Sequence, residues 1–183
     1  MVETPAGTSG EHRELLLMRH AKSSWGEPGR PDSERELSPR GRRDAPRVGR
    51  WLAESGLVPD HVVCSTARRV RETAEGVLPS LGIPLEAVRW SGRIYEASPA
   101  DLLAVLAESP EEARRVLMIG HNPGLEVLAE RLARGSVRIP PDGKFFPTAT
   151  VAHLVFDGRW NAVLPGRCEL RGIVRPRDLP ADG

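Results

Sequence analysis

The chain has 183 residues, a length that fits one domain able to bury about 70% of its unfolded surface. Hydrophobic residues make up 39% and charged residues 28%, as in soluble globular proteins. The formal net charge of +1 argues against a basic field that would bind nucleic acid or an anionic membrane, and two cysteines give no disulfide framework.

The ends of the chain differ in composition from its middle. Residues 1–12 are small and polar, so we expect a flexible lead without the apolar core of a signal peptide. Residues 13–175 are expected to form a single domain, and residues 176–183 a C-terminal tail. No run of 18 apolar residues predicts a transmembrane helix. The sequence therefore predicts a cytoplasmic protein, which we expect to be a monomer.

The first predicted strand, Glu14–Met18, contains three leucines and a methionine and ends abruptly in an arginine and a histidine. A loop rich in glycine, proline and charge follows over Ala21–Leu37. A loop of this length inside a compact domain is usually functional or disordered. Ser38 and Pro39 then favour a helix start, with Ser38 as N-cap, and Gly56 favours its end.

A second strand and helix follow in the same order. Asp60–Cys64 is a short apolar strand, and Ser65 or Thr66 is expected to cap a helix whose apolar positions recur at helical spacing. Gly82 is expected to end that helix. Leu85–Trp90 reads as a weaker strand.

The remaining elements repeat the alternation and then change character. Ser98 and Pro99 favour a third helix, and Arg115–Ile119 is a strong strand followed by a fourth helix. Thr150–Phe156 alternates, and the turn residues after it predict a hairpin with Trp160–Leu164.

The alternation of strands and helices predicts the fold class. We expect an α/β protein, a three-layer sandwich whose mostly parallel central sheet is flanked by helices on both faces. Residues 168–183, rich in arginine and proline, are expected to trail over the surface.

Polar residues follow three of the predicted strands, where the ligands of open α/β sheets bind. Arg19 and His20 end the first strand, Ser65 ends the second, and either Arg68 or Arg69 lies in the first turn of the next helix. The strand at 115–119 is followed by two more polar residues, His121 and Asn122. Arginines, histidines and helix N-termini at one sheet edge are typical of an anion site.

Phosphoryl transfer suits such a site, because the protein's task there is positioning and electrostatic stabilisation. A neutral imidazole can attack phosphorus, and neighbouring guanidinium groups help keep it neutral. No carboxylate cluster for magnesium and no third zinc ligand is evident, so no cofactor or metal is expected. The sequence also lacks GxGxxG and GxxxxGK[ST] nucleotide loops.

At these residues the chain resembles the histidine phosphatase superfamily, which has a phosphoglycerate-mutase-like fold, and within it the SixA-type phosphohistidine phosphatases. That family carries Arg-His-Gly, Ser-x-x-x-Arg-x-x-x-Thr and Gly-His after successive strands. The matching segments are Arg19-His20-Ala21, Ser65–Thr73 and Gly120-His121-Asn122-Pro123-Gly124, supported by Asp32–Ser38, Arg40-Gly41, Tyr95-Glu96-Ala97 and Glu126.

The resemblance implies a role for each matching residue. His20 would be the nucleophile that becomes phosphohistidine, and the phosphoryl oxygens would be held by Arg19, Arg69 and His121. Arg35 would add a contact from the loop. Ser65 and Asn122 are expected among the substrate-binding residues. Ala21 departs from the family's glycine and is tolerable only if its φ is negative.

The proton donor is left open between two acids. Glu96 occupies the position of the acid in larger relatives, and Asp32 matches a loop acid of the SixA type; each is also typical of an ordinary solvated loop acid. A phosphohistidine substrate has a labile P–N bond and so needs less help from a general acid.

Three functions remain compatible with the sequence. The leading one is a metal-independent phosphatase acting on phosphohistidine in a protein such as a histidine phosphotransfer domain. The second is a phosphatase for a small phosphomonoester. The third is a non-catalytic phosphate-sensing module, which the paired histidines and arginines disfavour.

Overall fold

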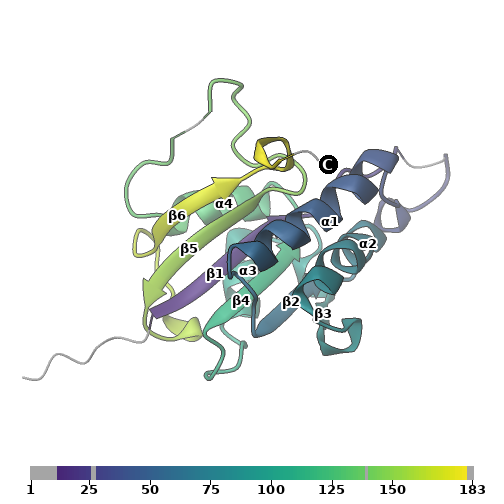
Figure 1. Ribbon diagram of the computed structural model, residues 1–183. Coiled ribbons are helices and arrows are strands. Elements are labelled where there is room, and N and C mark those ends of the chain that lie inside the picture. The colour runs from purple at the N-terminus through teal and green to yellow at the C-terminus, as the bar shows by residue number, and fades with distance from the viewer. Residues whose placement is uncertain (1–11, 26–27, 139, 181–183) are drawn as a thin grey trace, which may run out of the picture.

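The computed structural model describes residues 12–25, 28–138 and 140–180 (Figure 1). One six-stranded sheet runs through them in the order β3-β2-β4-β1-β5-β6. Its pairings give five strands one direction and reverse only β5, which confirms the mostly parallel sheet. The strands are β1 (His12–Arg19), β2 (His61–Ser65), β3 (Arg89–Ser91), β4 (Arg115–Gly120), β5 (Val151–Asp157) and β6 (Glu169–Val174).

Four α-helices cover the two faces of this sheet, as the three-layer prediction requires. In Figure 1, α1 and α2 lie in front of the sheet, and α3 and α4 lie behind it. Each pair of helices packs on its own hydrophobic core. The helices are α1 (Pro39–Glu54), α2 (Arg68–Val77), α3 (Pro99–Leu106) and α4 (Gly124–Leu132).

Strand β1 lies between β4 and β5, near the middle of the sheet, and is buried on both faces. Leu15 and Leu17 pack in the core with α3 and α4, whereas Leu16 and Met18 pack in the core with α1 and α2. This burial on both faces explains why the strand reads as a continuous apolar run. Its polar end therefore opens at the carboxyl edge of the sheet.

The hairpin prediction for the C-terminal half is wrong in its second strand. Trp160–Ala162 forms a 3-10 helix, and the buried indole of Trp160 donates to the Ala113 carbonyl over 2.8 Å. The partner of β5 is the later segment Glu169–Val174. Burial of Trp160 takes the chain away from the sheet after the Asp157–Gly158 turn, so the predicted surface segment from 168 onward supplies the edge strand instead.

The predicted tail also packs on the domain as far as it is described. Pro176 is buried, and Leu179 packs against the core on the side of α1. Arg47 of α1 donates to the carbonyls of Leu179 and Pro180. The predicted flexible lead, residues 1–12, is wrong at its last residue, because His12 begins β1 and pairs with Asp157 of β5. Residues 1–11 lie outside the described residues.

Two element boundaries differ from the sequence pattern. Ser38 caps α1 as predicted, accepting from the Gly41 amide, but α2 begins at Arg68 with Ala67 as its N-cap residue. Ser65 lies further back, at the end of β2. The third strand is shortened to Arg89–Ser91 because a 3-10 turn occupies the residues before it. No described helix is long and apolar enough to cross a membrane.

Candidate active site

The carboxyl ends of β1, β2 and β4 bring the predicted site residues together. Arg19 pairs with Gly120 in the sheet, and the His20 amide donates to the Gly120 carbonyl over 3.0 Å. His121 follows Gly120 directly, so the two histidines end neighbouring parallel strands. Their ring centroids are 5.3 Å apart.

His20 is buried, and its ring is held by a hydrogen bond to the backbone of the next residue. The Nδ1 atom lies 2.7 Å from the Ala21 carbonyl oxygen, which can only accept. Nδ1 must therefore carry the proton, and the lone pair is on Nε2. Burial, joined by the nearby charges of Arg69 and Arg19, lowers the pKa of His20 to about 3. The side chain is thus a neutral imidazole at pH 7 with a nucleophilic Nε2.

Arg19 is largely buried beside this histidine. Its Nη1 donates to the Phe146 carbonyl over 3.0 Å, and its Nε is buried without a partner in the described part of the chain. Burial lowers its pKa, while Glu126 acts in the opposite direction.

Arg69 and His121 form a second, connected part of the site. Arg69 Nη2 lies 3.3 Å from His121 Nδ1, which must accept because a guanidinium only donates. The proton of His121 is then on Nε2, which lies 2.8 Å from Ser65 Oγ and donates to it. Burial, followed by the charge of Arg69, lowers the pKa of His121 to about 4. Ser65 therefore holds His121 rather than pointing free into a substrate site.

Asp32 faces Arg69 from the loop after β1. It accepts from Arg69 Nη2 over 3.0 Å, from Arg35 Nη1 over 2.9 Å and from the Tyr95 hydroxyl over 2.8 Å. The hydrogen bond from Arg35, together with Tyr95 and Arg69, lowers the pKa of Asp32 to about 2. An ionised carboxylate with these partners orients Arg69 and has no proton to give at neutral pH.

Two predicted residues, Arg35 and Asn122, lie in the surroundings of the cluster. Arg35 is held by Asp32, the Ser24 carbonyl and the Ser23 hydroxyl. Asn122 donates to Glu126 over 2.6 Å and to the Phe146 carbonyl over 3.0 Å, so its amide nitrogen is already engaged. Contacts to substrate from Arg35 and Asn122 remain predictions.

Glu96 is the predicted acid that the structure leaves outside the cluster. It is exposed, its φ of 51° is left-handed, and within the described residues it makes no hydrogen bond or ion pair. Neither candidate acid is therefore placed as a proton donor by the observed contacts.

Backbone at Ala21 is fixed by a side chain of α2. The Ala21 amide donates to Thr73 Oγ1 over 3.0 Å, and Thr73 in turn donates to the Arg69 carbonyl over 2.6 Å. Ala21 is not among the described residues with positive φ, so alanine fits without strain where the family pattern has glycine. Thr73 thus links the strand end that carries His20 to the helix that carries Arg69.

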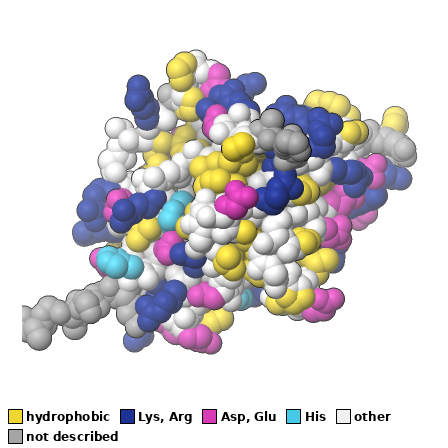
Figure 2. Space-filling view, in the orientation of Figure 1, with side chains coloured by type: hydrophobic (Ala, Val, Ile, Leu, Met, Phe, Trp, Pro, Cys, Tyr) yellow, Lys and Arg dark blue, Asp and Glu magenta, His cyan; other side chains and the backbone are white. Residues whose placement is uncertain are grey.

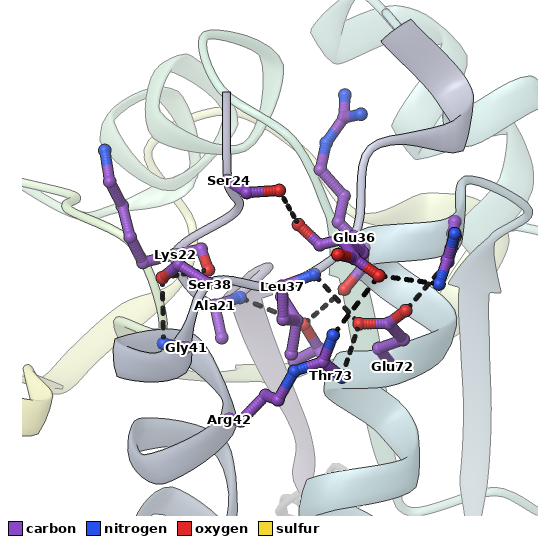
Figure 3. Close-up of polar contacts among 12 residues, drawn as sticks. Ala21, Lys22, Ser24, Glu36, Leu37, Ser38, Gly41, Arg42, Glu72 and Thr73 are labelled. Atoms are coloured by element: carbon purple, nitrogen blue, oxygen red, sulfur yellow. Dashed lines mark hydrogen bonds and ion pairs between the residues drawn. The ribbon is translucent and has the colours of Figure 1, made fainter. Parts of the chain in front are cut away.

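The loop after His20 is tied down by a network of charges (Figure 3). Glu72 of α2 accepts from the Leu37 amide over 2.8 Å and pairs with Arg68 and Arg42. Glu36 pairs with the same two arginines. The sequence analysis assigns Arg68 no such role, because the sequence alone does not show that Glu36 and Glu72 lie beside it.

The start of α1 lies directly against this loop. The Lys22 carbonyl accepts from the Ser38 amide over 2.8 Å and from its hydroxyl over 3.0 Å. A Cβ on Gly41 would lie 2.2 Å from the same carbonyl oxygen, so glycine permits the close approach. This contact fixes the backbone two residues beyond His20.

Together these groups can hold a phosphoryl group and present a nucleophile to it. Two arginines and the His121 edge surround a neutral imidazole whose free lone pair is on Nε2. Among the described residues, no group of three or more His, Cys, Asp or Glu side chains is placed to hold a metal ion.

Comparison with known proteins agrees with this arrangement. The model of the histidine phosphatase superfamily, branch 1, matches residues 15–90. SixA from Nakamurella multipartitia superposes with a TM-score of 0.77 at 33% identity, over 94% of this chain and 99% of that one. The chain belongs to the histidine phosphatase superfamily. Within this superfamily it is of the SixA type.

Two further relatives show how far the likeness extends. SixA from Agrobacterium tumefaciens superposes with a TM-score of 0.72 at 26% identity, covering 90% of this chain and 98% of that one. The uncharacterized protein Rv1276c of Mycobacterium tuberculosis is 36% identical over 167 residues, which are 87% of this chain and the whole of that protein. The superfamily model and the SixA structures support phosphatase activity for this superfamily member.

Sequence reasoning missed the contribution of Tyr95. Its ring meets the His121 ring edge-on at 5.3 Å, lies under the Arg69 guanidinium at 5.7 Å, and its hydroxyl holds Asp32. The sequence signal was the only tyrosine of the chain, a few residues after a short strand of the same sheet. Spacing alone does not show that a side chain there reaches a loop 63 residues away.

Proposed function

We propose that this superfamily member is a metal-independent phosphatase that removes phosphoryl groups from phosphohistidine in a protein, through a phosphohistidine intermediate on His20. The observation that carries the proposal is the state of His20. It is a buried, neutral imidazole with its Nε2 lone pair free, beside the guanidinium groups of Arg19 and Arg69.

The proposed reaction has two displacements at phosphorus. In the first, His20 Nε2 forms a bond to phosphorus while the bond from phosphorus to the substrate nitrogen breaks, and the leaving imidazole keeps the electron pair. Arg19 and Arg69 stabilise the charge on the phosphoryl oxygens, and His121 joins them by turning its Nε2–H from Ser65 Oγ to one of these oxygens. In the second, a water oxygen bonds to phosphorus, the Nε2–P bond breaks, and inorganic phosphate leaves.

The leaving group decides between the substrate classes. An alcohol leaves slowly unless an acid protonates it, whereas a phosphorylated imidazole can take up its proton from solvent. Asp32 is ionised at neutral pH, and within the described residues Glu96 makes no hydrogen bond or ion pair with the cluster. The site thus favours a labile P–N bond, in keeping with SixA, which is described as a protein histidine phosphatase in its tungstate complex.

Discharge of a phosphorylated histidine phosphotransfer domain tests the proposal. Wild-type protein should release inorganic phosphate from it faster than from a panel of small phosphomonoesters. His20→Ala should release none above background, and His12→Ala, which removes an exposed histidine in a surface pair with Asp157, should match wild type. One small ester hydrolysed far faster than the phosphoprotein would assign the enzyme to a metabolite instead.

A further inference from the structure

A pocket of about 570 Å³ adjoins the phosphate site on the side of Arg19. Arg19 lines this pocket, whereas His20, Arg69 and His121 do not. Its walls come from the start of the loop after β1, the N-terminus of α1, the segment before β5 and the residues after β6. The charged residues in the lining are Arg19, Lys22, Arg40, Lys144, Arg175 and Arg177, with Glu126 and Asp142 as the two acids.

Both acids of the lining already have partners. Asp142 pairs with Arg175 over 3.4 Å and with Arg177 over 2.5 Å, and Glu126 accepts from Asn122 over 2.6 Å. Figure 2 shows basic side chains along the upper edge of this face, with acidic ones between them.

The two lysines of the lining are exposed and have no such partner. Within the described residues, the ammonium groups of Lys22 and Lys144 make no hydrogen bond or ion pair. Figure 3 shows the Lys22 side chain extending away from the polar contacts drawn around it. The pocket therefore carries uncompensated positive charge next to the site of phosphoryl transfer.

The wall of the pocket is joined to the nucleophile's strand end. The Phe146 carbonyl accepts from both Arg19 and Asn122, and the Ala149 amide lies 3.1 Å from the carbonyl oxygens of Arg19 and His20. The rings of Phe145 and Phe146 are buried beneath this segment. This wall of the pocket is thus held at a fixed position relative to His20.

We propose that this pocket binds a second anionic group of the substrate, a carboxylate carried near the phosphorylated histidine by an acidic side chain of the phosphoprotein. This inference rests on the proposed function, because the carboxylate is taken to belong to a phosphoprotein substrate. The chemistry recognised is the anion itself, so a small phosphoester bearing a carboxylate would use the same pocket.

Matched substrates test the pocket. The first pair is a histidine peptide with glutamate on both sides of the histidine and its glutamine counterpart, each phosphorylated with phosphoramidate. The second pair is 3-carboxyphenyl phosphate and phenyl phosphate. Wild-type protein should show a kcat/KM about tenfold higher for the anionic member, and the ratio should fall as ionic strength rises.

Charge removal in the pocket should reduce this preference. Lys22→Gln and Lys144→Gln should each lower the ratio about two- to fivefold, the range of one exposed ionic contact, and Lys144→Glu should bring it near one. Arg167→Gln is the matched control, because it removes one exposed positive charge outside the pocket lining, beside the start of β6. It should leave the ratio unchanged.

The outcomes separate this inference from the proposed function. Equal wild-type rates within both pairs, or an equal loss of preference in Arg167→Gln, would overturn the pocket's role even if the peptides are dephosphorylated. If the enzyme prefers 3-carboxyphenyl phosphate over phenyl phosphate but leaves both phosphorylated peptides intact, the proposal of a phosphohistidine substrate is wrong. The proposed role of the pocket in binding a carboxylate is then supported.

Discussion

The phosphate site and the pocket beside it are both basic, but they are built differently. In the phosphate site, His20, Arg69 and His121 are buried, and short contacts fix every ring and guanidinium. In the pocket, Lys22 and Lys144 are exposed and end in free ammonium groups. The first arrangement suits a single small group held for reaction, and the second suits an anion whose position varies with the substrate.

This contrast separates catalysis from selectivity. Changes in the phosphate site should lower turnover of every substrate by a similar factor, since the phosphoryl group is common to all of them. Changes in the pocket should act on anion-bearing substrates alone. In the phosphate site, the expected effects decrease from Arg69 through the two buried histidines and Asp32 to Thr73.

Loss of Arg69 should have the largest effect. Arg69→Ala removes a charged donor from the phosphoryl oxygens and frees Asp32, so kcat/KM should fall about 10³-fold on anionic and plain substrates alike. Arg71→Ala is the control on the same helix, because Arg71 stacks on Trp90 instead. If kcat/KM fell only for the glutamate peptide, Arg69 would determine substrate selectivity, and the proposed division between the phosphate site and the pocket would be wrong.

The buried histidines should make folding stability depend on pH. Burial holds the pKa of His20 near 3 and that of His121 near 4, whereas the ordinary pKa of histidine is 6.5. At a pH between 6.5 and these lowered values, the two histidines are therefore protonated in the unfolded chain but largely neutral in the folded protein. The free energy of unfolding should therefore drop as pH falls from about 6.5 towards 4, by on the order of 2 kcal/mol per histidine.

Urea unfolding at pH 7 and pH 4.5 measures this effect. A His20→Asn/His121→Asn double variant should show a smaller decrease than wild type, because neither site can take up a proton. Equal decreases in the two proteins would mean that the histidines titrate normally and are not held neutral by the fold.

Replacement of Asp32 distinguishes an orienting carboxylate from a general acid. Asp32→Asn weakens the hold on Arg69 and should lower kcat about tenfold for aryl phosphates of every leaving-group pKa. A general acid would instead show losses that grow as the leaving group becomes more basic. A plot of log kcat against leaving-group pKa for wild type and variant provides the measurement.

The smallest effect is expected at Thr73. Thr73→Val removes the hydrogen bond to the Ala21 amide and should lower kcat about fivefold, while Thr73→Ser should restore most of it. Near-identical kcat values for the valine variant and wild type would show that Ala21 is held adequately by the remaining contacts.

The sequence predicted the convergence of Arg19, His20 and His121 at the sheet edge far better than the surroundings of that cluster. Arg19, His20 and His121 are placed by strand ends, and a strand buried on both faces is readable from Leu15–Met18 alone. The family resemblance and the α/β class are confirmed by the sheet order and by the SixA structures. Local pattern was sufficient because parallel strands deliver their ends to one edge.

Elements that depend on distant contacts were not readable. Glu169–Val174 alternates charged and apolar residues around a glycine and forms a strand only because β5 lies beside it. The contact of Tyr95 with Asp32 and the convergence of Lys22 with Lys144 join segments far apart in the chain. No spacing rule links such residues, so the pocket could not be inferred from sequence.

Trapping the phosphoenzyme tests the central claim most directly. Wild-type protein is mixed briefly with radiolabelled phosphoramidate, quenched in alkali and digested, and the labelled peptide is mapped. We predict one labelled site, stable to base and labile to acid as a phosphorylated imidazole, on the peptide containing His20, and no label in His20→Ala. Label on another residue, or turnover by His20→Ala at the wild-type rate, would contradict the account.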